Sequence, residues 1–326
     1  MGFNVYVTRW VPEAALERLR QVCEVVEVNP DERQRTHEEL VAAVRGRDGV
    51  LSMLTDAIDA AVLEAARGAR GFANCAVGYN NIDVARATEL GLVVTNTPGV
   101  LTDTTADLAW ALLLAVARRI AEGDAYMREG RFTGWSPMLM LGADVSGRTL
   151  GIVGAGRIGT AVARRSAGFS MRVLYCDEPP NGTIEKEVGA RRVGFEELLR
   201  EADFVTVHVP LTPQTRHLFD ARAFDMMKPT AIFLNTTRGP VHDEAALVEA
   251  LRTGVIAGAG LDVYEDEPAM APGLAELPNV VVVPHVGSAT VGTRTRMATM
   301  AAENLVAMLE GRRAPNCVNP EVYERK

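Results

Sequence analysis

The stretch NVVVVPHVGSAT, residues Asn279 to Thr290, places a histidine directly after a run of four valines. The valines predict a buried strand, and His285 stands just beyond Pro284 at its end. An imidazole there could donate a proton at the mouth of an active site, or it could merely follow a strand. A lone histidine favours the second interpretation. A proton donor therefore requires a cofactor site, an orienting carboxylate and a substrate-binding cation elsewhere in the chain.

A glycine-rich loop supplies the first requirement. GAGRIG, residues Gly154 to Gly159, has the pattern G-x-G-x-x-G, follows an apolar strand and opens a helix, and a second apolar strand ends at Asp177. This context is the one that a dinucleotide-binding loop needs, because the helix amino terminus presents free N–H groups and a positive dipole to a pyrophosphate. The residues expected to contact the cofactor here are Gly154, Gly156, Arg157, Ile158 and Gly159.

Asp177 predicts which dinucleotide binds. A carboxylate at the end of the second strand accepts hydrogen bonds from both hydroxyls of the adenosine ribose. It repels a 2′-phosphate by about 4 kcal/mol at contact, for an effective dielectric constant near 20. Glu178 adds a second negative charge, and the next basic residue along the chain is Lys186. The sequence therefore predicts NAD(H), with NADH preferred over NADPH.

Three further residues follow apolar strands and complete a set for carbonyl reduction. Arg238 follows AIFLNTT, Glu267 follows GLDVY, and His285 follows NVVVV. A guanidinium can bind a carboxylate with its rigid fork, and an imidazolium can protonate an alkoxide as hydride reaches the carbon. A carboxylate on the second ring nitrogen orients the imidazole and favours its cationic form. We therefore expect hydride transfer between a nicotinamide and a 2-oxo acid.

The elements that position these residues alternate between strands and helices along the chain. Such alternation predicts α/β architecture in two doubly wound units, each a parallel sheet with helices on both faces. The segment Thr102–Ile120 predicts a long helix that is apolar on several sides, which indicates burial on several sides or against another subunit.

Composition narrows the class of protein. The 326 residues are 48% hydrophobic and 23% charged, with a net charge of -8, which argues against nucleic acid or an anionic membrane as partner. The four cysteines are scattered, so we expect reduced thiols, no metal site and a cytoplasmic location. No secretory signal and no apolar run long enough to span a membrane is present.

Several segments together make the chain similar to the D-isomer-specific 2-hydroxyacid dehydrogenases along essentially its whole length. They are NTPGVLTDTTADLAWALLLA, GRTLGIVGAGRIGTAVARR, TTRGPVHDEAAL, GAGLDVYEDEP and PHVGSAT. The resemblance implies that Arg238, Glu267 and His285 are catalytic. It also implies a Rossmann-type cofactor domain over residues 100–287, a flavodoxin-like substrate domain over 1–99 plus 288–326, and a homodimer. The further cofactor contacts that it implies are Thr105, Pro210, Thr215, Thr236, Thr237, Arg238, Asp262 and His285.

The resemblance is strongest to glyoxylate and hydroxypyruvate reductases. CAVGYNNID resembles the loop whose backbone amides receive the substrate carboxylate, here at Val77 and Gly78. Leu54, Trp135 and Ser288 are the pocket residues implied alongside Arg238 and His285, and a dimer contact is an equal alternative for Trp135. The bulk of Leu54 and Val77 favours a substrate with a small side chain.

Three alternatives stay open at this point. Phosphite dehydrogenases share the fold but carry a lysine where this chain has Val77. D-3-Phosphoglycerate dehydrogenase would need extra basic residues for a phosphate. A non-catalytic, NADH-sensing scaffold of the corepressor type would not need an intact set of arginine, glutamate and histidine. Of the other histidines, His37 and His217 are expected on the solvated surface.

Overall fold

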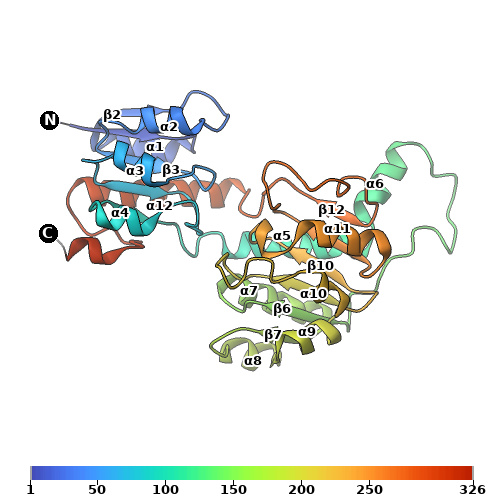
Figure 1. Cartoon of the computed structure of the whole chain (residues 1–326). Coiled ribbons are helices and arrows are strands. Elements are labelled where there is room, and N and C mark those ends of the chain that lie inside the picture. The colour runs from blue at the N-terminus through green and yellow to red at the C-terminus, as the bar shows by residue number, and fades with distance from the viewer. Residues whose placement is uncertain (1, 325–326) are drawn as a thin grey trace. The chain divides into compact units, whose positions relative to one another are not determined.

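The computed structural model describes residues 2–324, and the chain divides into two compact units. Unit 1 comprises Met1–Leu101 and Ser288–Lys326, and unit 2 comprises Thr102–Gly287. Each unit is an α/β structure with its own parallel sheet, which confirms the predicted fold class (Figure 1). None of the helices in the described part of the chain combines the length and the apolar character that crossing a membrane requires.

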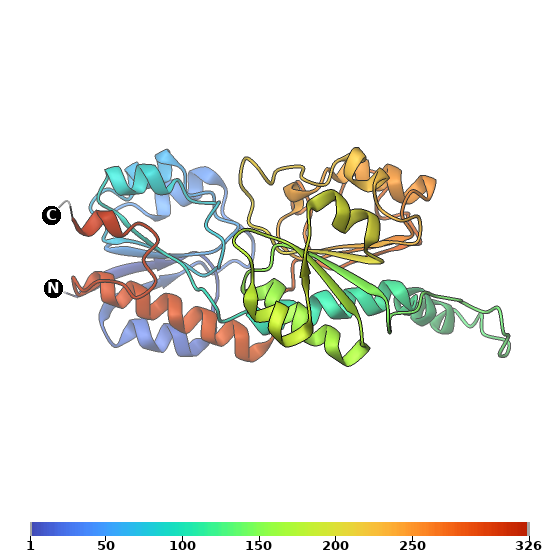
Figure 2. The same ribbon diagram turned by 90° about the horizontal axis from the view of Figure 1, so that it is seen from below.

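Unit 1 is built on a five-stranded sheet in the order β2-β1-β3-β4-β5, with every neighbouring pair parallel. Its strands are β1 (Phe3–Val7), β2 (Cys23–Val28), β3 (Gly49–Ser52), β4 (Gly71–Asn74) and β5 (Val93–Thr95). Two helices, α1 (Glu13–Arg20) and α12 (Val291–Leu309), cover one face (Figure 2). The other face carries α2 (His37–Ala43), α3 (Ala60–Ala65) and α4 (Val84–Glu89), and η3 (Pro320–Tyr323) follows near the end.

Local sequence signals explain where these helices begin. Thr36 caps α2: its hydroxyl accepts from the Glu39 amide, and the Glu39 carboxylate accepts from the Thr36 amide. This reciprocal capping satisfies two amide groups that the first turn leaves without helical partners, and such a cap stabilises a helix by about 1 kcal/mol. The helix therefore begins directly after Thr36, at His37.

Unit 2 is built on a seven-stranded parallel sheet in the order β12-β11-β10-β9-β6-β7-β8. Its strands are β6 (Thr149–Val153), β7 (Arg172–Cys176), β8 (Arg191–Arg192), β9 (Phe204–Val207), β10 (Ile232–Asn235), β11 (Gly258–Leu261) and β12 (Val280–Val282). One face is covered by α5 (Thr102–Ala117), α7 (Arg157–Ser166), η1 (Ala167–Phe169) and α8 (Gly182–Val188). The other is covered by α9 (Phe195–Glu201), α10 (Ala221–Asp225), η2 (Gly239–Val241) and α11 (Glu244–Thr253).

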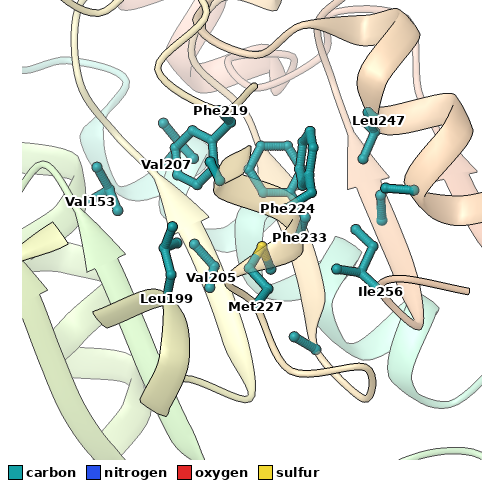
Figure 3. Packing of buried hydrophobic residues seen from close by; sticks show 14 of the residues in the cluster. Val153, Leu199, Val205, Val207, Phe219, Phe224, Met227, Phe233, Leu247 and Ile256 are labelled. Atoms are coloured by element: carbon teal, nitrogen blue, oxygen red, sulfur yellow. The ribbon is translucent and has the colours of Figure 1, made fainter. Parts of the chain in front are cut away.

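An aromatic cluster holds β10 in the core of unit 2. Phe219, Phe224 and Phe233 are fully buried, and Phe233 meets the edge of Phe224 with ring centroids 5.4 Å apart (Figure 3). Burying one such side chain contributes about 1.5–3 kcal/mol to folding. Because Phe233 belongs to β10, the cluster holds the strand whose carboxyl end leads to Arg238.

The long helix ends earlier than the sequence predicts. We expected it to reach Ile120, but α5 stops at Ala117, and Arg119 takes a left-handed conformation with φ of 54°. The Ala117 carbonyl accepts from the Ala143 amide instead of continuing the helical pattern. A second helix, α6 (Ile120–Arg128), then begins. The expected burial of α5 on several sides is confirmed by Trp110, Leu112 and their neighbours.

The order of strands in the unit 2 sheet reverses direction at β6. From β6 the chain builds outward to β7 and β8, and it then returns to place β9 on the other side of β6. Ligands of doubly wound sheets bind at this kind of reversal, outside the carboxyl ends of the strands. The loop from Gly154 to Gly159 leaves β6 at this point.

Candidate active site

A hydrogen-bonded pair, His285 and Glu267, forms the centre of the site. Nδ1 of His285 lies 2.9 Å from one carboxylate oxygen of Glu267 and 3.2 Å from the other. Because the carboxylate only accepts, Nδ1 carries the shared proton and Nε2 is the nitrogen left for a substrate. Burial raises the pKa of Glu267, but the His285 bond and charge and the Tyr264 amide outweigh it, so the pKa lies below its ordinary value.

Arg238 brings a cation to this pair from the neighbouring strand. Its Nη1 donates to the Thr237 carbonyl at 2.7 Å, and its charge lowers the pKa of Glu267. Burial lowers the pKa of Arg238 itself, against the opposing effect of Glu267. The next residue, Gly239, approaches so closely that a Cβ there would lie 1.9 Å from the Tyr264 backbone. Glycine is therefore needed to bring the Arg238 segment against the segment that precedes Glu267.

Asp262 holds the segment that follows His285. This buried carboxylate accepts from the amide of Val286 at 2.6 Å and from that of Gly287 at 2.8 Å. His285 itself has φ of 52°, a left-handed conformation that costs a residue other than glycine about 1–3 kcal/mol. The two Asp262 bonds offset that cost and fix the direction of the imidazole. Asp262, which the resemblance predicts to be a cofactor contact, thus also has a structural role that the sequence did not reveal.

The nucleotide loop has the geometry of a phosphate cradle. The helix α7 begins at Arg157, directly after Gly156, so its amino terminus faces the loop. A Cβ on Gly159 would lie 2.1 Å from the Gly154 carbonyl oxygen, whereas a Cβ on Gly156 would meet nothing within 4 Å. Gly159 therefore allows close packing, and Gly156 borders open space where a pyrophosphate would lie against the helix.

Asp177 stands at the end of β7, and the structure adds a cation beside it. The Asp177 carboxylate accepts from the amides of Ala155 and Glu178, both at 2.7 Å. Arg192 of β8 donates to the Asp177 carbonyl at 2.9 Å and to the Glu178 carboxylate at 2.7 Å. The residues that directly follow Asp177 in the sequence do not predict this cation. Arg192 lies 15 positions further along the chain and reaches the site through strand pairing.

The remaining expected cofactor contacts lie in ordered segments of unit 2. The hydroxyl of Thr105 donates to the Gly287 carbonyl at 3.2 Å, and that of Thr215 donates to the Pro210 carbonyl at 2.6 Å. The Thr237 hydroxyl donates to Asn235 at 2.9 Å, and Thr236 is buried beside it. Thr236 and Thr237 follow β10, and Pro210 and Thr215 lie in the segment after β9, so both pairs follow carboxyl strand ends.

The expected carboxylate-binding loop lies in unit 1, after β4. Asn96 donates to the Val77 carbonyl at 2.8 Å, and Asn74 donates to the Gly78 carbonyl at 3.0 Å. Asn81 donates to the Met53 carbonyl at 3.1 Å, just before Leu54. These bonds fix the backbone of the Val77–Gly78 loop and of the segment that leads to Leu54. Asparagine side chains commonly bind backbone groups in turns, and Asn81 in CAVGYNNID was the signal that could have predicted part of this network. Ser288, the other unit 1 residue, is half-buried.

Trp135 does not join the site within one chain. Its side chain is 82% exposed. The segment that carries it returns beside the end of α5 and the amino ends of β10 and β12, where Leu141 and Ala143 share a hollow with Ile232 and Val280. Arg238, Glu267 and His285 follow the carboxyl ends of the same sheet, so Trp135 lies away from them within its own unit, and the substrate pocket and the dimer contact both stay predictions for it.

Comparison with known proteins agrees with the geometry. Residues 110–287 match the family model described as D-isomer specific 2-hydroxyacid dehydrogenase, NAD binding domain. A glyoxylate reductase of Korarchaeum cryptofilum is 52% identical over 98% of this chain and 97% of that protein. A crystal structure of a protein from Thermus thermophilus has a TM-score of 0.90 at 48% identity, covering 97% of this chain and 99% of that one.

A further solved relative carries ligands. It is an NADPH-dependent glyoxylate/hydroxypyruvate reductase of Sinorhizobium meliloti in complex with NADP and malonate. Its TM-score is 0.85 at 34% identity, and the match covers 98% of this chain and 97% of that one. The chain belongs to the D-isomer specific 2-hydroxyacid dehydrogenase family. It is an oxidoreductase, and its cofactor is a nicotinamide dinucleotide.

The remaining histidines of the dehydrogenase behave differently from one another. His37 contacts Asp59 at the surface, as expected, and is 47% exposed. His217, also expected on the surface, is 36% exposed and contacts Glu265 at 2.6 Å. His242 is fully buried with Nδ1 3.0 Å from the Asn235 amide, and burial lowers its pKa to about 4. His242 is therefore neutral at physiological pH.

Substitutions of Gly156 and Gly159 in the nucleotide loop should have different effects. Gly156→Val should weaken NADH binding by at least about 10-fold with an unchanged melting temperature, because its side chain fills only the open phosphate space. Gly159→Ala should lower the melting temperature, because its Cβ collides with the Gly154 backbone. Fluorescence titration with NADH and differential scanning fluorimetry measure both. Normal NADH affinity in Gly156→Val would show that the pyrophosphate does not lie there.

Proposed function

We propose that the dehydrogenase uses NADH to reduce glyoxylate, hydroxypyruvate or both to the 2-hydroxy acid. The His285–Glu267 pair carries this proposal, since a proton donor oriented by a carboxylate stands beside Arg238 in the same unit as a dinucleotide loop. The identity of about 50% to several glyoxylate reductases supports this choice of substrate.

The proposed reaction divides between binding and proton transfer. Arg238 and the amides of Val77 and Gly78 receive the substrate carboxylate, and the Arg238 guanidinium polarises the 2-oxo group. The nicotinamide supplies the hydride. Nε2 of His285 then gives its proton to the oxygen that becomes the hydroxyl, while Glu267 stabilises the imidazolium through Nδ1. Leu54 and Ser288 complete the pocket.

The two units would divide these tasks. Residues 100–287 form the proposed cofactor domain, because they hold the nucleotide loop and the residues Arg238, Glu267 and His285. Residues 1–99 and 288–326 form the proposed substrate domain, because they hold the Val77–Gly78 loop and Leu54. We also propose a cytoplasmic location, on the basis of four cysteines that are all free thiols.

Initial rates of NADH oxidation with glyoxylate, hydroxypyruvate, pyruvate and 2-oxoglutarate test the activity. Glyoxylate or hydroxypyruvate should be the fastest. His285→Ala should lower kcat by ~10²–10⁴-fold with little change in NADH binding, because it removes only the proton donor. Arg238→Ala should raise KM and lower kcat together, because it removes both a binding and a polarising group.

Exposed histidine His37 supplies the control, since His37→Ala should leave all rates unchanged. Wild-type activity in His285→Ala would remove that residue from the mechanism. A parallel reaction with NAD and phosphite separates the alternatives: activity there alone would indicate a phosphite dehydrogenase. No activity with any substrate, despite NADH binding, would favour a non-catalytic sensor.

The preference for NADH is a separate proposal. It rests on Asp177, whose carboxylate follows β7, and on Glu178, whose carboxylate engages Arg192. An ion pair formed with Glu178 leaves Arg192 less able to bind a 2′-phosphate, and Asp177 repels that phosphate. The NADPH-dependent relative indicates that the same fold accommodates either cofactor.

Asp177→Ala combined with Glu178→Arg should shift the ratio of kcat/KM values toward NADPH by at least about 10-fold. The change removes two negative charges and adds a cation beside Arg192. Glu197→Gln is the control. Glu197 is 45% exposed and pairs with Arg191, which neighbours Arg192 on β8. An unchanged ratio in the double variant would show that Asp177 does not face the ribose.

A homodimer is the proposed assembly. Six large apolar side chains are exposed within a single segment of unit 2: Ile120, Met127, Phe132, Trp135, Met138 and Leu141. Beside the segment lies a hollow of about 550 Å³ lined mainly by apolar residues of α5 and the amino ends of β10 and β12. Contiguous exposed apolar surface of this kind marks an interaction site. In the proposed dimer, the exposed apolar segment of one copy packs into the hollow of the other copy. Trp135 then lies in the contact.

Light scattering after size-exclusion chromatography should give twice the mass of one chain. Trp135→Asp should shift the mass toward the monomer, because it buries a charge in the proposed contact. Trp10→Asp is the matched control, since Trp10 is 59% exposed but belongs to unit 1. A monomeric wild-type protein, or equal effects of the two substitutions, would contradict the proposed interface.

A further inference from the structure

One buried carboxylate that is not among the proposed catalytic residues grips the loop that carries Glu267. Glu244 is the first residue of α11 and is only 2% exposed. One of its oxygens accepts from the Glu265 amide at 2.7 Å, and the other accepts from the Ala271 amide at 2.8 Å. The two anchored amides lie on either side of Glu267 in the sequence. Glu244 therefore closes the Glu265–Ala271 segment into a loop that presents Glu267.

Glu244 does not serve to cap its own helix. That role belongs to Asp243, whose carboxylate accepts from the Ala246 amide at 2.9 Å. Burying a carboxylate is costly unless its oxygens are satisfied. Both bonds found for Glu244 go to the backbone of the Glu267 loop. A carboxylate suits this task because each of its oxygens accepts, whereas the glutamine amide offers a single acceptor.

Glu265, at the start of the same loop, adds further contacts that hold the loop. One Glu265 oxygen accepts from His217 at 2.6 Å and from Arg216 at 3.2 Å, and the other accepts from the Glu244 amide at 3.5 Å. The Glu244 and Glu265 side chains thus bind each other's backbone amides. The loop is tied to α11 in both directions.

Glu244 also lies on the segment that carries Arg238. Asn235 donates to the carbonyl of Arg238 at 2.9 Å and lies 3.0 Å from Nδ1 of His242, which fixes the backbone between β10 and α11. The Glu244 carboxylate, at the end of this segment, therefore ties the loop that carries Glu267 to the segment that carries Arg238. Because the imidazole contact depends on distances near 3 Å, a small shift of the loop would separate Glu267 from His285.

We propose that Glu244 is a positioning residue, which sets Glu267 against Nδ1 of His285 by holding the Glu265 and Ala271 amides. This inference rests on the proposed function, in which His285 is the proton donor. Arg238, Asp262 and Tyr264 also face Glu267. Their positions do not depend on the two Glu244 bonds alone, so loss of Glu244 should affect Glu267 first.

Steady-state kinetics from pH 5 to pH 9 should compare wild type, Glu244→Gln, Glu267→Gln and Glu249→Gln. Glu244→Gln should lower kcat for glyoxylate by about 10–100-fold, as expected for a catalytic group displaced by about 1 Å. The alkaline limb of its kcat/KM profile should move to lower pH, as in Glu267→Gln, because a carboxylate beside an imidazole favours the protonated ring. The KM for NADH should stay unchanged.

Glu249→Gln is the matched control, because Glu249 lies on the same helix but is exposed and pairs with Arg252. Its rate and pH profile should equal those of wild type. A Glu244→Gln enzyme with lowered kcat but an unshifted profile would reduce Glu244 to a structural role and overturn the proposal. Should Glu244→Gln not fold, Glu244→Asp keeps the charge but is too short to reach both amides, and it should give the same shift.

Hydrogen exchange separates this proposal from the proposed function. The segment 262–274 should exchange faster in Glu244→Gln than in wild type or Glu249→Gln, with other segments unchanged. Unchanged exchange there would overturn the anchoring role whatever the substrate. Faster exchange in a protein whose wild type reduces none of the oxo acids would leave the anchor intact and reject the proposed function instead.

Discussion

Parallel pairing of the seven strands of unit 2 is the constraint on which the site depends. Because neighbouring strands run in the same direction, their carboxyl ends share one edge, and every segment that leaves them begins there. Gly154 and Asp177 follow β6 and β7, and Arg238 and His285 follow β10 and β12. Residues more than a hundred positions apart thus reach the same edge without long loops, and the aromatic core beneath β10 holds that edge in place.

Charged groups at this edge are stabilised by backbone amides as much as by one another. Asp262 binds two amides after His285, and Glu244 binds two amides around Glu267. Backbone donors do not change charge with pH and lose little freedom on binding, so they can hold a carboxylate in one geometry. Among these four residues, the contact between Glu267 and His285 is the one that joins two titratable side chains.

The same use of side chains to fix backbone recurs in unit 1. Asn74 and Asn96 bind the carbonyls of Gly78 and Val77, which secures the loop whose amides are proposed to receive a carboxylate. In both units the residues proposed to touch substrate lie on loops, while the groups that hold those loops are buried or half-buried. A rigid scaffold with functional loops is the usual arrangement in α/β enzymes, and here the loops are secured individually.

The sequence alone predicted the α/β alternation and the nucleotide loop, and it pointed to Asp177, Arg238, Glu267 and His285 as candidate site residues, because strand periodicity and short motifs are local and parallel strands bring their ends together. Only the tertiary structure decided the rest. Arg192 reaches Glu178 across paired strands, and the Ala143 amide donates to the Ala117 carbonyl where α5 ends. Arg192 and Glu244 could not be predicted for the same reason: a side chain's partner can lie far away in the sequence, and a local pattern does not record it.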